Sequence, residues 1–131
     1  MIALYLAAIV SIAVPPTDSE MDKLFGAMLV VEGNPTNKKV HEPNGTITQG
    51  PYCISRAYWD DAMEFSDYVV DYDKYVNNHE MCEAVMRLYF KRYKACTLEQ
   101  MARIHNGGPR GMSKKSTEVY WAKVQEAMSN D

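Results

Sequence analysis

The sequence changes from a helical to an extended pattern within residues 32–54, EGNPTNKKVHEPNGTITQGPYCI. Before this stretch, apolar residues recur at helical spacing. Within it, two short runs containing β-branched residues flank Asn44 and Gly45. Asn-Gly between such runs is a strong hairpin signal, because both residues tolerate positive φ. The stretch therefore predicts a small antiparallel β-hairpin in a chain that is otherwise mostly helical, an α+β fold.

A helix is predicted just before this stretch. Thr17 and Glu20 have the spacing of a capping box, and the apolar residues after them repeat every three or four positions. Glu32 continues that apolar stripe, four residues after Met28. One interpretation is a frayed last turn with Glu32 in water. The other is an acid that keeps its proton against an apolar wall, as a general acid catalyst requires.

Size and composition predict one globular domain. The chain has 131 residues, of which 47% are hydrophobic and 24% charged, and its net charge is −3. The acidic balance argues against a nucleic-acid partner, which a basic surface would favour. Three aspartates between residues 67 and 73 lack the glycine and the terminal glutamate of an EF-hand loop. We therefore expect no metal site and no cofactor.

The first 16 residues are predicted to form a separate hydrophobic segment. Residues 2–14 carry no charge, and as a helix this run would reach only about 20 Å, against roughly 30 Å for the core of a bilayer. A Ser-Ile-Ala pattern before a Pro-Pro pair is typical of a secretory cleavage site, although no Lys or Arg precedes the run. We expect residues 1–16 to be signal-like, without a stable membrane span, and the protein to be secreted. An uncleaved anchor and a buried helix are the alternatives.

Four further helices are predicted downstream. The third of them begins with a capping box of Thr97 and Gln100, and its apolar face continues to His105. An Asn-Gly-Gly-Pro sequence then provides a strong stop signal. The predicted helices cover residues 54–65, 80–95, 97–104 and 116–128.

The helix over residues 80–95 carries a basic row of Arg87, Lys91 and Lys94. A solvated face is the usual interpretation of such a row, and contact with an anionic polymer is the alternative.

Three cysteines are too few for a disulfide framework or a CxxC metal site. A bridge between Cys82 and Cys96 and a set of buried free thiols, Cys53 included, are equally compatible with the sequence.

Two blocks of the sequence resemble the invertebrate-type (i-type, destabilase-like) lysozymes. The first is GPYCI at residues 50–54, followed by AYWDD at residues 57–61, and it is similar to the GPYQI and YWxD patterns of that family. The second is ARIHNGGPRG at residues 102–111, followed by YWAKV at residues 120–124. The order and spacing of these blocks match the family over most of the chain.

The resemblance implies a lysozyme-like catalytic domain over residues 17–131, with the small sheet beside an active-site cleft. It implies a monomeric, bacteriolytic glycosidase that cleaves the β-1,4 bond between N-acetylmuramic acid and N-acetylglucosamine in peptidoglycan and also binds chitooligosaccharides. The catalytic Glu of the family falls on Glu32. Its second catalytic carboxylate, an Asp, falls on Pro43, which cannot act as a nucleophile, and Glu42 is the candidate substitute.

The same resemblance implies a set of substrate contacts. The Gln of the GPYQI motif is Cys53 here, which changes one expected sugar contact. The implied substrate-binding residues are Tyr52, Cys53, Ile54, His105, Asn106 and Gly107.

Two other functions stay open at this stage. The displaced second carboxylate is compatible with a saccharide-binding protein that has lost hydrolysis. Some relatives are peptide isopeptidases, for which Cys53 is the one candidate nucleophile. Most of the cysteines of the family are missing, which suggests folding outside an oxidising compartment. A viral or microbial lytic enzyme retained by its N-terminal segment is therefore the alternative to secretion.

Overall fold

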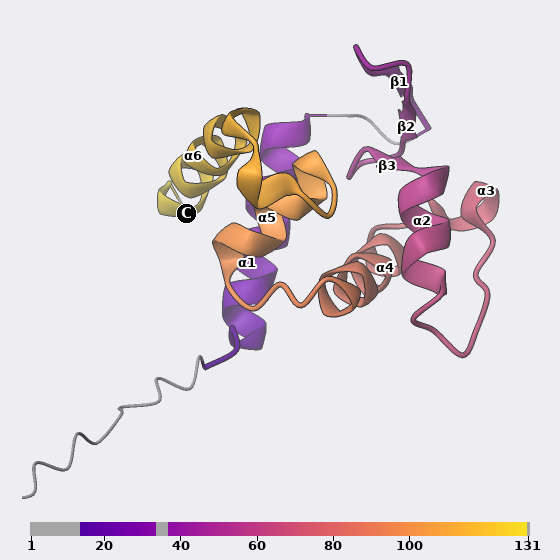
Figure 1. Cartoon of the computed structure of the whole chain (residues 1–131), viewed down its shortest axis with the longest axis horizontal. Helices are drawn as coiled ribbons and strands as arrows, with labels where there is room; N and C mark the ends of the chain where they lie inside the picture. Colours follow the sequence, from indigo (N-terminus) through magenta and orange to yellow (C-terminus); the bar gives the residue numbers. More distant parts are fainter. Residues whose placement is uncertain (1–13, 34–36, 131) are drawn as a thin grey trace, which may run out of the picture.

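Helices form most of the chain, and one small antiparallel sheet interrupts them (Figure 1). The structure is a computed structural model that describes residues 14–33 and 37–130, so the predictions for residues 1–13 lie outside the described residues. The predicted mostly helical α+β fold is confirmed. The elements are α1 Asp18–Glu32, β1 Lys39–His41, β2 Ile47–Gln49, β3 Ile54–Ser55, α2 Arg56–Met63, α3 Tyr72–Tyr75, α4 His79–Arg92, α5 Leu98–Gly107, the short 3-10 helix η1 Gly111–Ser113, and α6 Lys115–Ser129.

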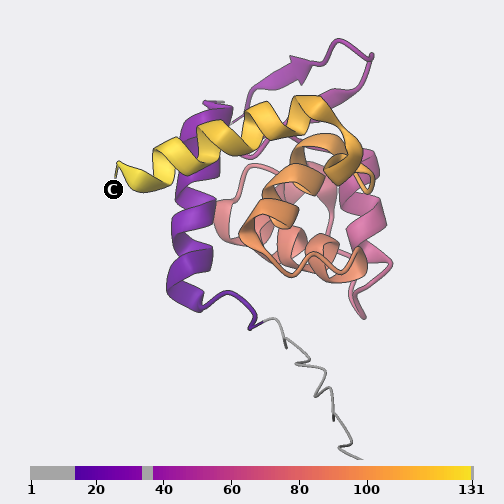
Figure 2. The same ribbon diagram turned by 60° about the vertical axis from the view of Figure 1, so that its left-hand side comes forward.

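The elements gather into two groups. Helix α6 crosses α1 and packs on α5, whereas α2 packs on α4 and adjoins the sheet (Figures 1 and 2). Strand β2 lies in the middle of the sheet and pairs antiparallel with both β1 and β3. Within the described ranges, no helix is both long enough and apolar enough to cross a bilayer.

Helix α1 forms where the sequence predicts it. The Thr17 hydroxyl accepts from the amide of Glu20 at 3.1 Å, and the Glu20 carboxylate accepts from the amide of Thr17 at 3.0 Å, so the capping box is confirmed. Leu24 and Met28 are fully buried on the inner face. Each such side chain contributes about 1.5–3 kcal/mol of transfer free energy relative to exposure. The stripe therefore fixes which face of α1 points inward.

The predicted hairpin is confirmed, but its turn is longer than a two-residue Asn-Gly loop. The strand pairing runs from Lys39 opposite Gln49 to His41 opposite Ile47, and residues 42–46 form the turn. The amide of Gly45 donates to the carbonyl of Glu42 at 3.0 Å, and Gly45 has φ +86°. Asn44 does not have positive φ; its side chain accepts from the amide of Thr46 at 3.0 Å instead. A proline at residue 43 allows this wider turn, with a single glycine in the left-handed region.

One predicted helix is shorter in the structure, and one further helix is present that the sequence did not predict. The helix expected from residue 54 begins at Arg56, because Ile54 and Ser55 pair with β2 and the Ser55 hydroxyl caps the amide of Tyr58 at 3.1 Å. The four-residue helix α3 was not predicted, because no clear period runs through its segment. The helices expected over residues 80–95, 97–104 and 116–128 are confirmed as α4, α5 and α6. All three cysteines are free thiols, so a Cys82–Cys96 bridge is excluded.

The connection between α5 and α6 is organised around a buried arginine. The side chain of Arg103 is 7% exposed. It donates to the Thr117 hydroxyl at 2.9 Å, to the Glu99 carboxylate at 2.8 Å and to the Met112 carbonyl at 3.0 Å. A buried guanidinium is tolerated only when its donors are satisfied in this way. The chain also passes so close that a Cβ on Gly111 would lie 2.1 Å from the Arg103 carbonyl oxygen.

We predict that Gly111→Ala lowers the free energy of unfolding by about 1–3 kcal/mol, because its methyl group would overlap the backbone at Arg103. The matched control is Gly26→Ala on the exposed face of α1, where a Cβ meets nothing within 4 Å. That change should stabilise the protein by about 0.5–1 kcal/mol, since glycine weakens a helix interior. Urea denaturation of both variants measures the difference. Equal effects would contradict the close packing at residue 111.

Candidate active-site cleft

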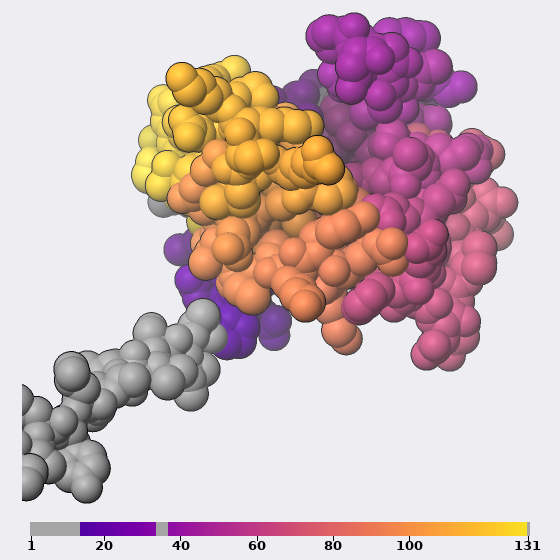
Figure 3. Space-filling model, in the orientation of Figure 1, coloured from indigo at the N-terminus to yellow at the C-terminus, as the bar shows by residue number. Residues whose placement is uncertain are grey.

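A cleft of about 680 Å³ separates the hairpin and α2 from the connection between α5 and α6. Figure 3 shows the hollow between these two parts of the surface. Most side chains that could do chemistry in the cleft come from segments far apart in the sequence. They are Glu32, Glu42, Cys53, Asp61, His105 and Lys114.

Glu32 occupies the last turn of α1, and its side chain is 16% exposed. Gly33 follows with φ +56° and ends the helix, so the backbone turns away from the cleft while the carboxylate stays in it. The Tyr120 hydroxyl donates to Oε1 of Glu32 at 2.9 Å, and Nε2 of His105 lies 3.6 Å from the same oxygen. These contacts contradict the frayed turn in water. Glu32 does not lie against an apolar wall alone, because a tyrosine hydroxyl and a histidine ring nitrogen approach its carboxylate.

Tyr120 holds this carboxylate from the opposite end of the chain. It is 7% exposed, and burial, together with the negative charge of Glu32, raises the pKa of the phenol. The hydroxyl therefore keeps its proton and donates it in a hydrogen bond. The sequence places Tyr120 in the helix predicted over residues 116–128. The apolar spacing of α6 is correct, but it gives no sign that the polar end of the ring reaches Glu32.

His105 is fixed by two hydrogen bonds. Nε2 lies 2.9 Å from the carbonyl oxygen of Tyr52, and Nδ1 lies 3.1 Å from the Tyr58 hydroxyl. A carbonyl can only accept, so Nε2 of the neutral ring carries the hydrogen and Nδ1 accepts from Tyr58. The Tyr58 ring in turn stacks on Tyr89, with centroids 3.7 Å apart. His105 is thus a firmly oriented group at the base of the cleft.

Cys53 lies beside both candidate carboxylates. Its thiol is close enough to Glu32 and Glu42 to feel the negative charge of both carboxylates. Burial, followed by the charge of Glu32, raises the pKa of the Cys53 thiol to about 12. A nucleophilic cysteine needs the opposite, a thiolate stabilised near neutral pH. His105, the expected base of a cysteine nucleophile, is bonded to Tyr52 and Tyr58 instead.

Two further carboxylates reach the cleft and differ in their surroundings. Glu42 lies in the hairpin loop, where it accepts from the Thr48 hydroxyl at 3.1 Å. Asp61 is paired with Arg92 at 2.8 Å and also accepts from the Tyr93 hydroxyl. A carboxylate already compensated by a guanidinium is poorly placed to serve as a nucleophile or base. Among the described residues, Asp61 therefore has a guanidinium partner and Glu42 has none.

The predicted substrate-binding residues divide into two groups. Cys53, His105, Asn106 and Gly107 line the cleft. Tyr52 and Ile54 do not: they are 1% and 0% exposed, and the Tyr52 ring packs edge-on against Phe25 in the core. Their side chains therefore cannot meet a substrate in this conformation. Only the Tyr52 carbonyl contributes to the site, through its bond to His105.

One basic residue in the cleft was missed by sequence reasoning. Lys114 donates from Nζ to the Gly107 carbonyl at 2.6 Å, across the end of α5, and it also lines the cleft. Its role depends on the path of the chain after the glycine pair, which no periodic pattern reveals. Within the described ranges, the cleft included, no cluster of three or more His, Cys, Asp or Glu side chains is placed to hold a metal ion.

The Destabilase family model matches residues 29–127, about three quarters of the chain. The chain belongs to this family. It is 38% identical over 81 residues to "Lysozyme 1" of Crassostrea virginica, an alignment that covers 58% of this chain and 42% of that protein. It is 35% identical over 86 residues to a lysozyme of Magallana gigas, covering 62% of this chain and 61% of that protein. The chain thus spans less than two thirds of these two relatives.

Solved structures in this family share the fold. A crystal structure of Tapes japonica lysozyme superposes with a TM-score of 0.66 at 27% identity, covering 79% of this chain and 86% of that one. An inhibitor-bound lysozyme from Meretrix lusoria gives a TM-score of 0.65 at 29% identity, covering 79% and 87%. These comparisons confirm the predicted resemblance to invertebrate-type lysozymes and the predicted lysozyme-like fold.

We predict that iodoacetamide labels Cys96 first in the native protein near neutral pH, because Cys96 is the exposed thiol. Burial raises the pKa of both Cys53 and Cys82 to about 12, so their thiolates stay scarce until the pH approaches that value. Mass spectrometry after timed labelling measures the order, and the denatured chain, in which all three thiols should react, is the control. Labelling of Cys53 as fast as Cys96 would contradict the arrangement and revive the isopeptidase hypothesis.

Proposed function

We propose that the protein is a lysozyme that hydrolyses the β-1,4 bond between N-acetylmuramic acid and N-acetylglucosamine in peptidoglycan, with Glu32 as the general acid. The observation that carries the proposal is a mostly buried carboxylate that lines a cleft and accepts a hydrogen bond from Tyr120. Membership of the destabilase family and the lysozyme names of its bivalve relatives support the same reaction. Peptidoglycan and chitooligosaccharides are the proposed partners, and the proposed place of action is outside the cell.

The hydrogen bond from Tyr120 suggests which oxygen of Glu32 would donate the proton. Tyr120 donates to Oε1, so in the neutral acid the proton resides on Oε2. This leaves Oε2 to approach the glycosidic oxygen, and the fixed Oε1 keeps the side chain in one orientation during the reaction. Cys53 and His105 flank the carboxylate and limit its contact with water.

Glu42 is the proposed second carboxylate. Pro43 occupies the position where the family has its second acid, and the wider turn of this hairpin brings the preceding residue to the cleft. The bond from the Thr48 hydroxyl restrains one of its oxygens. A separation of about 5–5.5 Å between the two acids would suit a nucleophile and retention, and about 6.5–9.5 Å would suit activation of water and inversion.

A saccharide-binding protein without turnover is the second candidate. The loss of an acid at Pro43 is the observation that favours it. The cleft supplies amide, hydroxyl and backbone groups from Asn106, Thr48 and Gly107, which suit the hydroxyls and acetamido groups of a sugar in either case. Turnover of cell walls separates the two functions, because binding alone does not clear a suspension.

We predict that Glu32→Gln abolishes clearing of bacterial cell-wall suspensions, with a loss of at least about a hundredfold, because the amide cannot protonate a leaving group. The unfolding midpoint should change little, since an amide oxygen still accepts from Tyr120. A matched control is Glu126→Gln on the exposed face of α6, which should keep full activity. Full activity in Glu32→Gln would show that the acid is misassigned.

Glu42→Gln and Asp61→Asn extend the same assay to the second acid. Glu42→Gln should lower the wall-clearing activity about a hundredfold or more if Glu42 acts as a base or nucleophile. Asp61→Asn should lower it less, because Asp61 forms an ion pair with Arg92. A fully folded wild type that binds chitooligosaccharide but never clears walls would favour the saccharide-binding protein instead.

A further inference from the structure

A second groove lies on another part of the surface, where the start of α1 meets the C-terminal end of α4. Its volume is about 430 Å³. The floor is apolar and is built from Pro16, Met21, Phe90 and Met101. No residue of the catalytic cleft lines this groove, so the lysozyme reaction gives it no role.

Three cationic side chains surround this floor. Arg87, Lys91 and Lys94 follow one another on α4 and just after it, and no carboxylate lines the groove with them. None of the three forms an ion pair with any residue in the described part of the chain. Arg87 instead lies over the ring of Phe25, with its guanidinium carbon 5.3 Å from the ring centroid. Helix α1 carries Asp18, Glu20 and Asp22 in its first turns, but none of them lines the groove, whose own charged side chains are all positive.

Exposed apolar groups occur at the same end of the molecule. The loop between α2 and α3 exposes 48% of Phe65, 77% of Tyr68 and 91% of Val69. Figures 1 and 2 both place this loop at the end where α1 begins, opposite the hairpin. Val14, which is 84% exposed and precedes the two prolines of the groove, ends the uncharged run of residues 2–14.

We propose that this end of the protein docks onto the surface of a bilayer that contains anionic lipids. Large apolar side chains gain free energy by entering the interfacial region, and lysines and arginines beside them are attracted to negatively charged head groups. A soluble anionic polymer would use the charges but would leave the apolar floor and the loop uncovered. The hairpin and the cleft beside it lie away from this end, so docking leaves the cleft open to a wall polymer.

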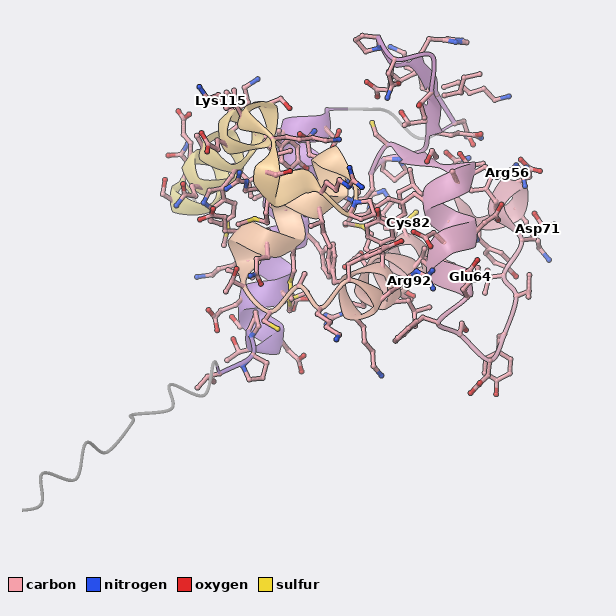
Figure 4. The ribbon with its side chains drawn as sticks, viewed as in Figure 1. Arg56, Glu64, Asp71, Cys82, Arg92 and Lys115 are labelled. Carbon is pink, nitrogen blue, oxygen red and sulfur yellow. The ribbon has the colours of Figure 1, made fainter. Side chains whose placement is uncertain are left out.

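The test is sedimentation of the full chain with vesicles of phosphatidylcholine alone or mixed with phosphatidylglycerol. The protein should bind the mixed vesicles more tightly, and added salt should weaken the binding. Lys91→Gln/Lys94→Gln should lower the affinity for mixed vesicles by about tenfold or more. The matched control is Lys115→Gln/Lys123→Gln on α6, which removes the same charge from another surface (Figure 4) and should keep the wild-type affinity.

A second variant tests the apolar part of the surface. Tyr68→Ser/Val69→Ser should weaken binding to mixed vesicles severalfold while wall clearing stays unchanged, because the loop lies outside the cleft. Equal binding to both kinds of vesicle, or equal losses in the two lysine pairs, would overturn the proposal. Complete displacement by soluble polyglutamate at matched salt would also overturn it, in favour of an anionic polymer. The vesicle-binding outcomes do not depend on whether the lysozyme assignment is correct.

Discussion

The hydrogen bond from Tyr120 to Glu32 joins two residues 88 positions apart and fixes the acid on which the site depends. A carboxylate that is only 16% exposed needs such partners, because an unsatisfied buried charge is too costly. The bond requires α6 to cross the end of α1, which the packing of those two helices provides. The orientation of the proposed acid therefore depends on the tertiary structure, although Glu32 lies at the end of an ordinary amphipathic helix.

The position of α6 depends in turn on the short connection after α5. Arg103 binds the Thr117 hydroxyl and carbonyls of this connection. Gly107 and Gly111 allow it to pass close to its neighbours, where a Cβ would fall within 2.5 Å of another atom. The same segment supplies His105 and one wall of the cleft. The run of residues 102–111 thus holds the last helix in place and also forms one wall of the cleft.

Sequence patterns predicted the parts of the fold that are set by local chemistry. Capping boxes, apolar stripes and the Asn-Gly turn located the helices and the hairpin, and the place of Glu32 on its stripe made it the candidate acid. The side chains of Tyr52 and Ile54 were misplaced, because both depend on long-range contacts. Ile54 pairs with Gln49 and is fully buried, and Tyr52 packs edge-on against Phe25 and His79. The contact of the Tyr120 hydroxyl was missed for a related reason. The spacing of apolar residues predicts which helix face is buried, whereas the partner of the hydroxyl is determined by the packing of α6 on α1.

The central claim is that Glu32 donates the proton to the scissile glycosidic oxygen. A crystal structure of Glu32→Gln with a bound chitooligosaccharide tests it most directly, because the substitution keeps the geometry and prevents cleavage. The account predicts that a glycosidic oxygen lies about 2.6–3.2 Å from the side-chain amide of residue 32, with Glu42 on the other side of the sugar ring. An oligosaccharide bound in the cleft with residue 32 directed away from every glycosidic oxygen would contradict it.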